Sequence, residues 1–299
     1  AGMSARYHVT DVFAEAPYTG NQLATFLLAA DIDDPEMQRI ARAFNFAEST
    51  FVTGGSLADG FDVRIFTPAE ELPFAGHPAL GTAHLLREVM HPQASAITLN
   101  LGVGPIVVCF VPDDSGGVVA WMEQNPCSYG DELDRSAAAR ALGLEPGDVD
   151  ASMPVQEVST GLATVVVPLT SLAALRRIEP DNSAIREFLS AAAEAKNVLV
   201  VCREPYEAHQ QVAARMFAPE LGVTEDPATG SANGAFAGYI LRHSYLGEGP
   251  VRAAIGQGYE IGRPSTLWLE AGAEGGAMRI RVGGRVATVA VGDWLPLMD

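Results

Sequence analysis

The fold is decided by residues 64–86, which read RIFTPAEELPFAGHPALGTAHLL and which have a second copy, RMFAPELGVTEDPATGSANGAFAGYI, at residues 215–240. Each copy begins with the apolar pattern of a strand that ends at a proline, and continues through a turn into a helix of small residues. When the copies are aligned by Pro-Ala-x-Gly, residues 77–83 correspond to residues 226–232. The sequence therefore predicts a duplicated strand–turn–helix unit, and its two turns are candidate site elements.

A shorter repeat supports a duplication of the whole chain. Leu-Ala-Thr occurs at residues 23–25 and again at residues 162–164, ahead of the longer repeat in both halves. We therefore predict an α+β fold of two similar β-rich halves, residues 1–124 and 125–299, each holding a helix, with the last strand free to return to the first half. Chance similarity between turns rich in Gly and Ala is the alternative.

Charge and apolar patterning exclude several kinds of partner. The 299 residues include 19 Lys and Arg against 37 Asp and Glu, for a formal net charge of −18. Such a surface repels phosphodiester backbones and anionic lipids, so neither nucleic acid nor a membrane is an expected partner. No apolar run approaches the ~20 residues of a membrane-spanning helix. Three widely spaced cysteines and the lack of a signal pattern favour a reducing cytoplasm, with no metal site.

One lysine limits the covalent chemistry that the chain can perform. Lys196 is the only lysine, and it lies where a helix predicted over residues 181–196 gives way to a strand. Schiff-base and pyridoxal-phosphate chemistry require a lysine amine, and a helix C-terminal cation is the simpler interpretation of this one. The sequence also lacks a phosphate-binding P-loop and a complete dinucleotide-binding glycine motif. No cofactor is therefore expected.

The two turns have features of an anion-binding site. Each of His77 and Asp226 precedes a proline, which we place at the first helical position, so that both residues become N-caps. Free N–H groups in the first helical turn attract a carboxylate or a developing enolate. Gly76 and Gly230 let a ligand approach the backbone.

Structural explanations compete with these functional ones. Aspartate before Pro-Ala-x-Gly is a good N-cap in its own right, whereas histidine is a poor one, so His77 favours a function more than Asp226 does. The hydroxyls of Ser231 and Thr82 can simply bond within their own helices. Glu48 lies where a helix gives way to a strand, and a lone glutamate there is usually a solvated surface group.

Several long motifs resemble the PhzF-like isomerases, the phenazine-biosynthesis-like family of the diaminopimelate-epimerase fold. They are MQRIAR at 37–42, ESTFV at 48–52, the two repeats, and GQGYEIGRPS at 256–265. The resemblance spans nearly the whole chain. It implies two pseudo-symmetric β-barrel-like halves, each wrapped around a central helix, in a homodimer that isomerises a small cyclic carboxylate resembling an amino acid without a cofactor.

The same resemblance implies roles for individual residues. It places the general acid/base on Glu48, the other catalytic side chains on His77 and Asp226, and substrate binding on Gly76, Gly230 and Ser231. The related epimerases and racemases use two thiols, one at each helix start, and none of Cys109, Cys127 and Cys202 falls in either repeat. We therefore predict that one carboxylate removes a proton and returns it elsewhere, which is isomerisation. The alternatives are isomerisation or epimerisation of another small carboxylate, and binding without catalysis.

Overall fold

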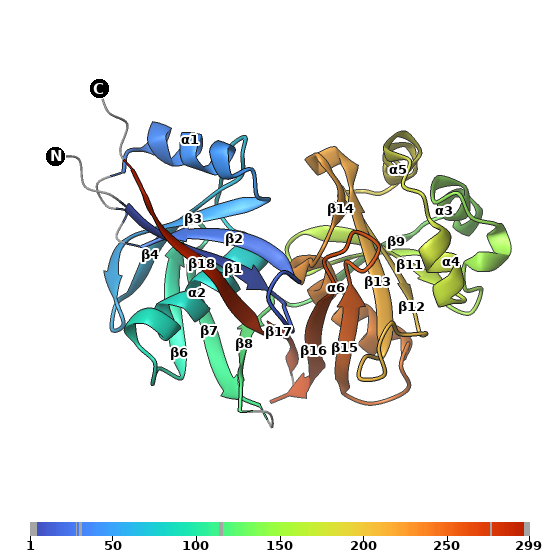
Figure 1. The fold of residues 1–299 in the computed structure, drawn as a ribbon. Coiled ribbons are helices and arrows are strands. Elements are labelled where there is room, and N and C mark those ends of the chain that lie inside the picture. Colours follow the sequence, from blue (N-terminus) through green and yellow to red (C-terminus); the bar gives the residue numbers. More distant parts are fainter. Residues whose placement is uncertain (1–4, 28, 30–31, 114–115, 276, 296–299) are drawn as a thin grey trace. The chain divides into compact units, whose positions relative to one another are not determined.

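The computed structural model describes residues 5–27, 29, 32–113, 116–275 and 277–295. The chain forms two compact units, one of Ala1–Met122 with Gly284–Asp299 and one of Glu123–Gly283. The division that we placed at 124/125 lies close to the first of these boundaries, and the C-terminal strand belongs to the first unit (Figure 1).

The first unit contains a sheet in the order β18-β1-β2-β3-β4-β6-β7-β8, with the short β5 paired to the end of β4. All neighbours are antiparallel except β2 with β3 and β4 with β6. The strands are β1 (Ala5–Val12), β2 (Asn21–Phe26), β3 (Glu48–Ser56), β4 (Gly60–Phe66), β5 (Glu71–Leu72), β6 (Ala96–Leu101), β7 (Gly104–Pro112), β8 (Val118–Glu123) and β18 (Val286–Trp294).

The second unit repeats this topology strand for strand. Its order is β9-β10-β11-β12-β13-β15-β16-β17, with β14 paired to the end of β13. The parallel pairs, β11 with β12 and β13 with β15, fall at the same places as in the first unit. The strands are β9 (Ser128–Glu132), β10 (Gln156–Ser159), β11 (Ala163–Leu169), β12 (Val198–Cys202), β13 (Val212–Ala218), β14 (Val223–Asp226), β15 (Val251–Gln257), β16 (Ser265–Glu274) and β17 (Ala277–Gly284).

Each unit is wrapped around one central helix, α2 (Gly76–Met90) in the first and α6 (Gly230–His243) in the second. Helix α2 contacts β1, β2, β3, β6, β7 and β18, which surround it (Figure 1). The helix needs small residues because the strands lie so close: a Cβ atom on Gly81 would come within 2.6 Å of a Val12 methyl carbon. The small-residue pattern of both repeats thus reflects burial on all sides.

The remaining helices pack outside the sheets. In the first unit, α1 (Asp34–Phe44) buries Met37, Ile40 and Ala41 in a cluster with aromatic residues of β2 and β3. The second unit carries α3 (Arg135–Ala141), η1 (Pro146–Asp148), α4 (Leu172–Arg177), α5 (Asn182–Leu189) and η2 (Pro219–Leu221). Among the described residues, no helix is long and apolar enough to cross a membrane.

The helix that we predicted over residues 181–196 is shorter than expected. Helix α5 ends at Leu189, and Lys196 lies exposed in the loop that leads to β12. The buried carboxylate of Glu157 accepts hydrogen bonds from the N–H groups of Glu194 and Ala195, both at 3.2 Å. A tertiary contact therefore overrides the helical preference of the alanine-rich segment.

Candidate active site

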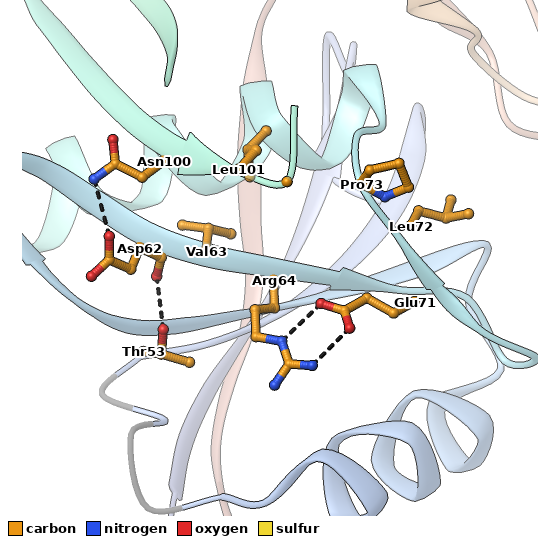
Figure 2. A pocket seen from close by; sticks show the side chains of 10 residues that line it. Thr53, Asp62, Val63, Arg64, Glu71, Leu72, Pro73, Asn100 and Leu101 are labelled. Carbon is orange, nitrogen blue, oxygen red and sulfur yellow. Dashed lines mark hydrogen bonds and ion pairs between the residues drawn. The ribbon is translucent and has the colours of Figure 1, made fainter. Parts of the chain in front are cut away.

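Matching ion pairs show how the two repeats correspond. Arg64 donates from Nε and Nη2 to the two carboxylate oxygens of Glu71, at 2.8 and 2.7 Å (Figure 2). Arg215 makes the same bidentate contact with Glu225, at 3.0 and 2.7 Å. Between its arginine and its glutamate, the second copy has three residues more than the first, and this longer segment includes η2.

A second pair of contacts fixes the same correspondence. A Cβ atom on Gly102, just after β6, would lie 2.9 Å from Cα of Pro73, and one on Gly258, just after β15, would lie 2.6 Å from the Pro227 carbonyl oxygen. Each proline is followed, at the same interval, by the glycine that begins the central helix. Gly76 therefore corresponds to Gly230.

This correspondence corrects the sequence-based alignment. His77, the second residue of α2, matches Ser231, the second residue of α6, and does not match Asp226. Neither predicted N-cap is correct, because Ala75 and Thr229 are the N-cap residues and Asp226 is the last residue of β14. The shared Pro-Ala-x-Gly letters led to the error, since residues 78–81 lie inside α2, whereas residues 227–229 precede α6 and only Gly230 belongs to it.

Both central helices begin without a side-chain cap from the described residues. Ala75 has no side-chain acceptor. The Thr229 hydroxyl, which could cap α6, instead donates to the carboxylate of Asp226. Uncapped N–H groups combine with the helix dipole to attract negative charge. The beginnings of α2 and α6, at Gly76 and Gly230, are therefore suited to bind a carboxylate or an enolate oxygen.

The end of α1 positions Glu48. The helix terminates at Asn45, which adopts a left-handed conformation (φ 54°) and donates its N–H to the carbonyl oxygen of Ala41 at 3.1 Å. Phe46 then packs against Phe44, with ring centroids 5.5 Å apart. Glu48 follows as the first residue of β3, and its side chain is 17% exposed. The predicted helix-to-strand junction is confirmed.

Glu48 and His77 come together within the first unit. Oε2 of Glu48 lies 3.4 Å from Nε2 of His77, and the histidine side chain is 8% exposed. Burial lowers the pKa of His77 to about 3, and a hydrogen bond to the backbone of Gln22 offsets this only in part. The imidazole is therefore neutral at pH 7, and the pair does not carry opposite charges.

The tautomer of His77 follows from these contacts. Nε2 has no hydrogen-bond partner among the described residues, so the bond to the Gln22 backbone belongs to Nδ1. A bond that raises the pKa is one in which Nδ1–H donates to the carbonyl oxygen, which leaves the Nε2 lone pair facing Glu48. Nε2 is therefore a hydrogen-bond acceptor that lies 3.4 Å from Oε2 of Glu48.

In the second unit, a polar network holds Asp226 beside the start of α6. Gln257 is fully buried, and its Nε2 donates to the Asp226 carbonyl oxygen at 2.8 Å and to the Thr229 hydroxyl at 3.1 Å. Nδ2 of Asn233 donates to Oε1 of Gln257 at 2.9 Å. We did not predict Gln257, Asn233 and Thr229 as site residues from the sequence, although Gln257 lies within GQGYEIGRPS.

The position of Glu48 carries no acid in the second unit. Leu23 lies opposite Glu48 in the parallel pair β2 and β3, and Thr25 lies opposite Thr50. In the matching pair β11 and β12, the Thr164 hydroxyl bonds to Asn197 in the same way. Glu48 lies two residues before Thr50, and the residue two before Asn197 is Ala195. Any chemistry that depends on a carboxylate at this position is therefore confined to the first unit.

A pocket of the first unit lies away from Glu48 and His77. It has a volume of about 470 Å³, and its lining includes the Arg64–Glu71 pair, Asp62 and Pro73 (Figure 2). Neither Glu48 nor His77 lines it. This pocket is therefore not the candidate site.

A family model described as phenazine biosynthesis-like protein matches residues 10–292. The chain belongs to this family. A trans-2,3-dihydro-3-hydroxyanthranilate isomerase of Pseudomonas aeruginosa is 38% identical over 96% of this chain and 98% of its own length. A protein of Mesorhizobium japonicum named only as an uncharacterized isomerase is 36% identical over 96% of this chain and 97% of its own length. The chain is an isomerase of the PhzF family.

Solved structures agree with this assignment. A Bacillus anthracis phenazine biosynthesis protein of the PhzF family is 26% identical, with a TM-score of 0.90, over 99% of this chain and 100% of its own. A hydroxyproline epimerase from Agrobacterium vitis, 11% identical, has a TM-score of 0.60 over 97% of this chain and 92% of its own, a likeness of fold alone. The predicted α+β, diaminopimelate-epimerase-like fold is confirmed.

The lowered pKa of His77 predicts a specific loss of stability in acid. An unfolded histidine takes up a proton below a pH of about 6.5, whereas the folded one does so only near its pKa of about 3. The free energy of unfolding therefore falls as the pH decreases through this window. Between pH 7 and pH 4, His77→Gln is expected to lose about 3 kcal/mol less than the wild type in urea unfolding. Equal losses would contradict the neutral, buried state of His77.

Proposed function

We propose that this isomerase acts on trans-2,3-dihydro-3-hydroxyanthranilate, a small cyclic amino acid, without a cofactor. The close approach of Glu48 to His77 carries the proposal, together with the 38% identity to a protein named for this reaction. The catalytic residues are Glu48, His77 and Asp226, and the substrate-binding ones are Gly76, Gly230 and Ser231. The reaction belongs to phenazine, and hence antibiotic, biosynthesis.

In this proposal Glu48 acts first as the general base. Its carboxylate removes the proton from C3 of the substrate, and negative charge develops along the conjugated system towards the substrate carboxylate. The N–H groups at the start of α2, at Gly76, are the donors that stabilise this charge, since no side chain of the described residues caps them. The Nε2 lone pair of His77 accepts a hydrogen bond from the protonated Glu48 and stabilises it.

Glu48 then acts as the general acid. It returns the proton to a carbon further along the same face of the ring, and the product enol becomes an aminoketone. A positioned acid/base group of this kind accelerates proton transfer by about 10²–10⁴-fold. The absence of a carboxylate at Ala195 supports a shuttle by one group, because a two-base epimerisation needs an acid/base on each side of the substrate.

The second unit contributes binding groups in this proposal. Gly230 offers a backbone N–H at the start of α6, and Ser231 offers one more N–H and a hydroxyl. Asp226 accepts from the Thr229 hydroxyl, which makes no cap on α6. We assign Asp226 to the amino group of the substrate, which its negative charge would attract.

One observation favours a second candidate function. Relatives of nearly the same identity as the named enzyme, such as the protein of Mesorhizobium japonicum, are isomerases without a named substrate. Isomerisation or epimerisation of another small carboxylate would use the same helix starts and the same Glu48. A family member that binds such a molecule without turnover would show no proton exchange with any of them.

We also propose that the chain works as a homodimer in the cytoplasm. The homodimer follows from the family resemblance. The compartment is consistent with the cysteines, since Cys109, Cys127 and Cys202 are all free thiols. Sedimentation at several protein concentrations would test the dimer.

The substrate assignment predicts a ranking of candidate compounds. With trans-2,3-dihydro-3-hydroxyanthranilate, kcat/KM is expected to exceed that for proline, hydroxyproline or diaminopimelate by about 10²-fold or more, because the polar groups of the site pair with one substrate only. Product formation is followed by NMR for each compound. A larger kcat/KM for another carboxylate would replace the substrate, and no turnover of any compound would favour the binding function.

A further inference from the structure

A chain of three buried threonine hydroxyls crosses the interior of the first unit. Oγ1 of Thr50 lies 2.8 Å from Oγ1 of Thr25 and 2.8 Å from Oγ1 of Thr82. Each of the three residues is 0% exposed. A hydroxyl donates one hydrogen bond and accepts others, so the central Thr50 can donate to one neighbour while it accepts from the other. Two hydrogen bonds thus link three elements of the fold.

Those three elements are the ones that carry the contacts of the candidate site. The first threonine lies on β2 with Gln22, the second on β3 with Glu48, and the third on α2 with His77. The contacts of His77 with the Gln22 backbone and with Glu48 therefore join the same three elements as the two hydrogen bonds among the threonines. Two sets of contacts, their own and those of the threonines, therefore fix the relative positions of Gln22, Glu48 and His77.

The second unit lacks a hydrogen bond that corresponds to the one between Thr50 and Thr82 on the central helix. The hydroxyl of Thr164 bonds to Asn197, which matches the link between β2 and β3. The helix position that corresponds to Thr82 holds Phe236, which is 0% exposed and apolar. The bond to the central helix therefore occurs in the unit that carries the acid/base carboxylate, and its counterpart is missing in the other.

Apolar packing alone would not require hydroxyls here. Valine has nearly the shape of threonine, and a buried hydroxyl is unfavourable unless it is hydrogen-bonded. Apolar contacts are non-directional, whereas a hydrogen bond prefers one distance and one direction. A bond from Thr50 to Thr82 therefore limits both the sliding and the rotation of α2 against β3.

We propose that Thr25, Thr50 and Thr82 are positioning residues, which hold α2 against β3 so that His77 stays within reach of the Glu48 carboxyl. The inference rests on the proposed function, because it assigns the threonines a role in the same proton transfer. They act through Glu48 and His77 and do not touch the substrate. A displacement of about 1 Å at such a site costs about 10²-fold in rate.

Thr82→Val tests the link because it removes the hydroxyl that joins α2 to Thr50 and keeps the hydrogen bond between Thr25 and Thr50. The kcat for trans-2,3-dihydro-3-hydroxyanthranilate is expected to fall about 10- to 100-fold with little change in KM, since proton transfer suffers more than binding. Thr82→Ser restores a hydroxyl and is expected to recover most of the loss. Thr164→Val breaks the matching bond of the second unit and is expected to leave kcat unchanged.

Three outcomes of this comparison overturn the inference. The first is an equal fall of kcat in Thr164→Val and Thr82→Val, which would indicate general destabilisation. The second is a loss that Thr82→Ser does not reverse, and the third is a kcat of Thr82→Val equal to that of the wild type. If Thr82→Val does not fold, Thr82→Ala removes the same hydroxyl without an added methyl group, and the same outcomes decide.

A second measurement separates this inference from the proposed function because it needs no substrate. The nitrogen-15 chemical shift of His77 Nε2 responds to the neighbouring carboxyl, so Glu48→Gln is expected to change it in the otherwise wild-type chain. In the Thr82→Val background the same substitution is expected to change the shift much less. An undiminished change overturns the positioning role. A wild type that turns over no compound would contradict the proposed function alone.

Discussion

Glu48→Gln is expected to reduce kcat for trans-2,3-dihydro-3-hydroxyanthranilate by about 10²–10⁴-fold, because an amide can neither accept the C3 proton nor return it. Glutamine has the size of glutamate, and the side chain at this position is partly exposed, at 17%, so the fold and the binding of substrate are expected to persist. Steady-state kinetics and thermal unfolding measure the two effects separately. Isothermal titration with the substrate gives its affinity.

The chain offers a matched control for this variant. Glu70 is an exposed carboxylate of the same unit, and Glu70→Gln removes the same charge away from His77. It is expected to keep the wild-type kcat. If Glu48→Gln turned over substrate at nearly the wild-type rate, the assignment of Glu48 as the acid/base would be wrong. If it failed to fold or to bind, its low rate would not support a role in proton transfer.

Glu225→Gln is expected to lower the free energy of unfolding by about 3 kcal/mol, because the buried guanidinium of Arg215 loses its bidentate counter-charge and keeps only Oε2 of Glu260, 3.8 Å from Nε, as an acidic neighbour. The side chains of Arg215 and Glu225 are each only 4% exposed. Arg215 also donates to the carbonyl oxygens of Leu175 and Ile178, at 3.1 and 2.8 Å, and so ties β13 to the end of α4. Urea unfolding, monitored by circular dichroism, measures the loss.

The first repeat provides the control for this prediction. Glu71 makes the same bidentate contact with Arg64, but the two side chains are 42% and 27% exposed. Exposed ion pairs contribute little, so Glu71→Gln is expected to cost less than about 1 kcal/mol. The two pairs differ in burial, and Arg64 also keeps the carboxylate of Asp34 as a partner. If Glu225→Gln and Glu71→Gln lowered the free energy of unfolding by similar amounts, burial would not explain the stability of the Arg215–Glu225 pair.

Most of the architecture could be predicted from the repeated segment, because its signals are local. A strand that ends at a proline, a turn and a helix of small residues are each specified within a few positions. The register between the copies could not be predicted in this way. It depends on the contacts of Arg64 with Glu71 and of Arg215 with Glu225, which extend across an insertion in the second copy. Alignment by the shared Pro-Ala-x-Gly letters therefore paired His77 with the wrong residue.

The candidate site was predictable in part. The family resemblance pointed to Glu48, and the helix-to-strand junction before it could be predicted from the local pattern. The neutral state of His77 could not, because it depends on burial by the surrounding sheet and on a backbone group of Gln22. The end of α5 was mispredicted for a similar reason, since the carboxylate of Glu157 acts from a distant strand. Long-range contacts were invisible in the sequence.

A deuterium label at C3 of trans-2,3-dihydro-3-hydroxyanthranilate reports directly whether Glu48 removes the C3 proton. The wild-type chain is incubated in H₂O with substrate that carries deuterium at C3, and NMR follows the label and the product. We expect the label to leave C3 at the rate of product formation, and Glu48→Gln to show neither event. A product that keeps deuterium at C3, or loss of the label at the wild-type rate in Glu48→Gln, would contradict this role of Glu48.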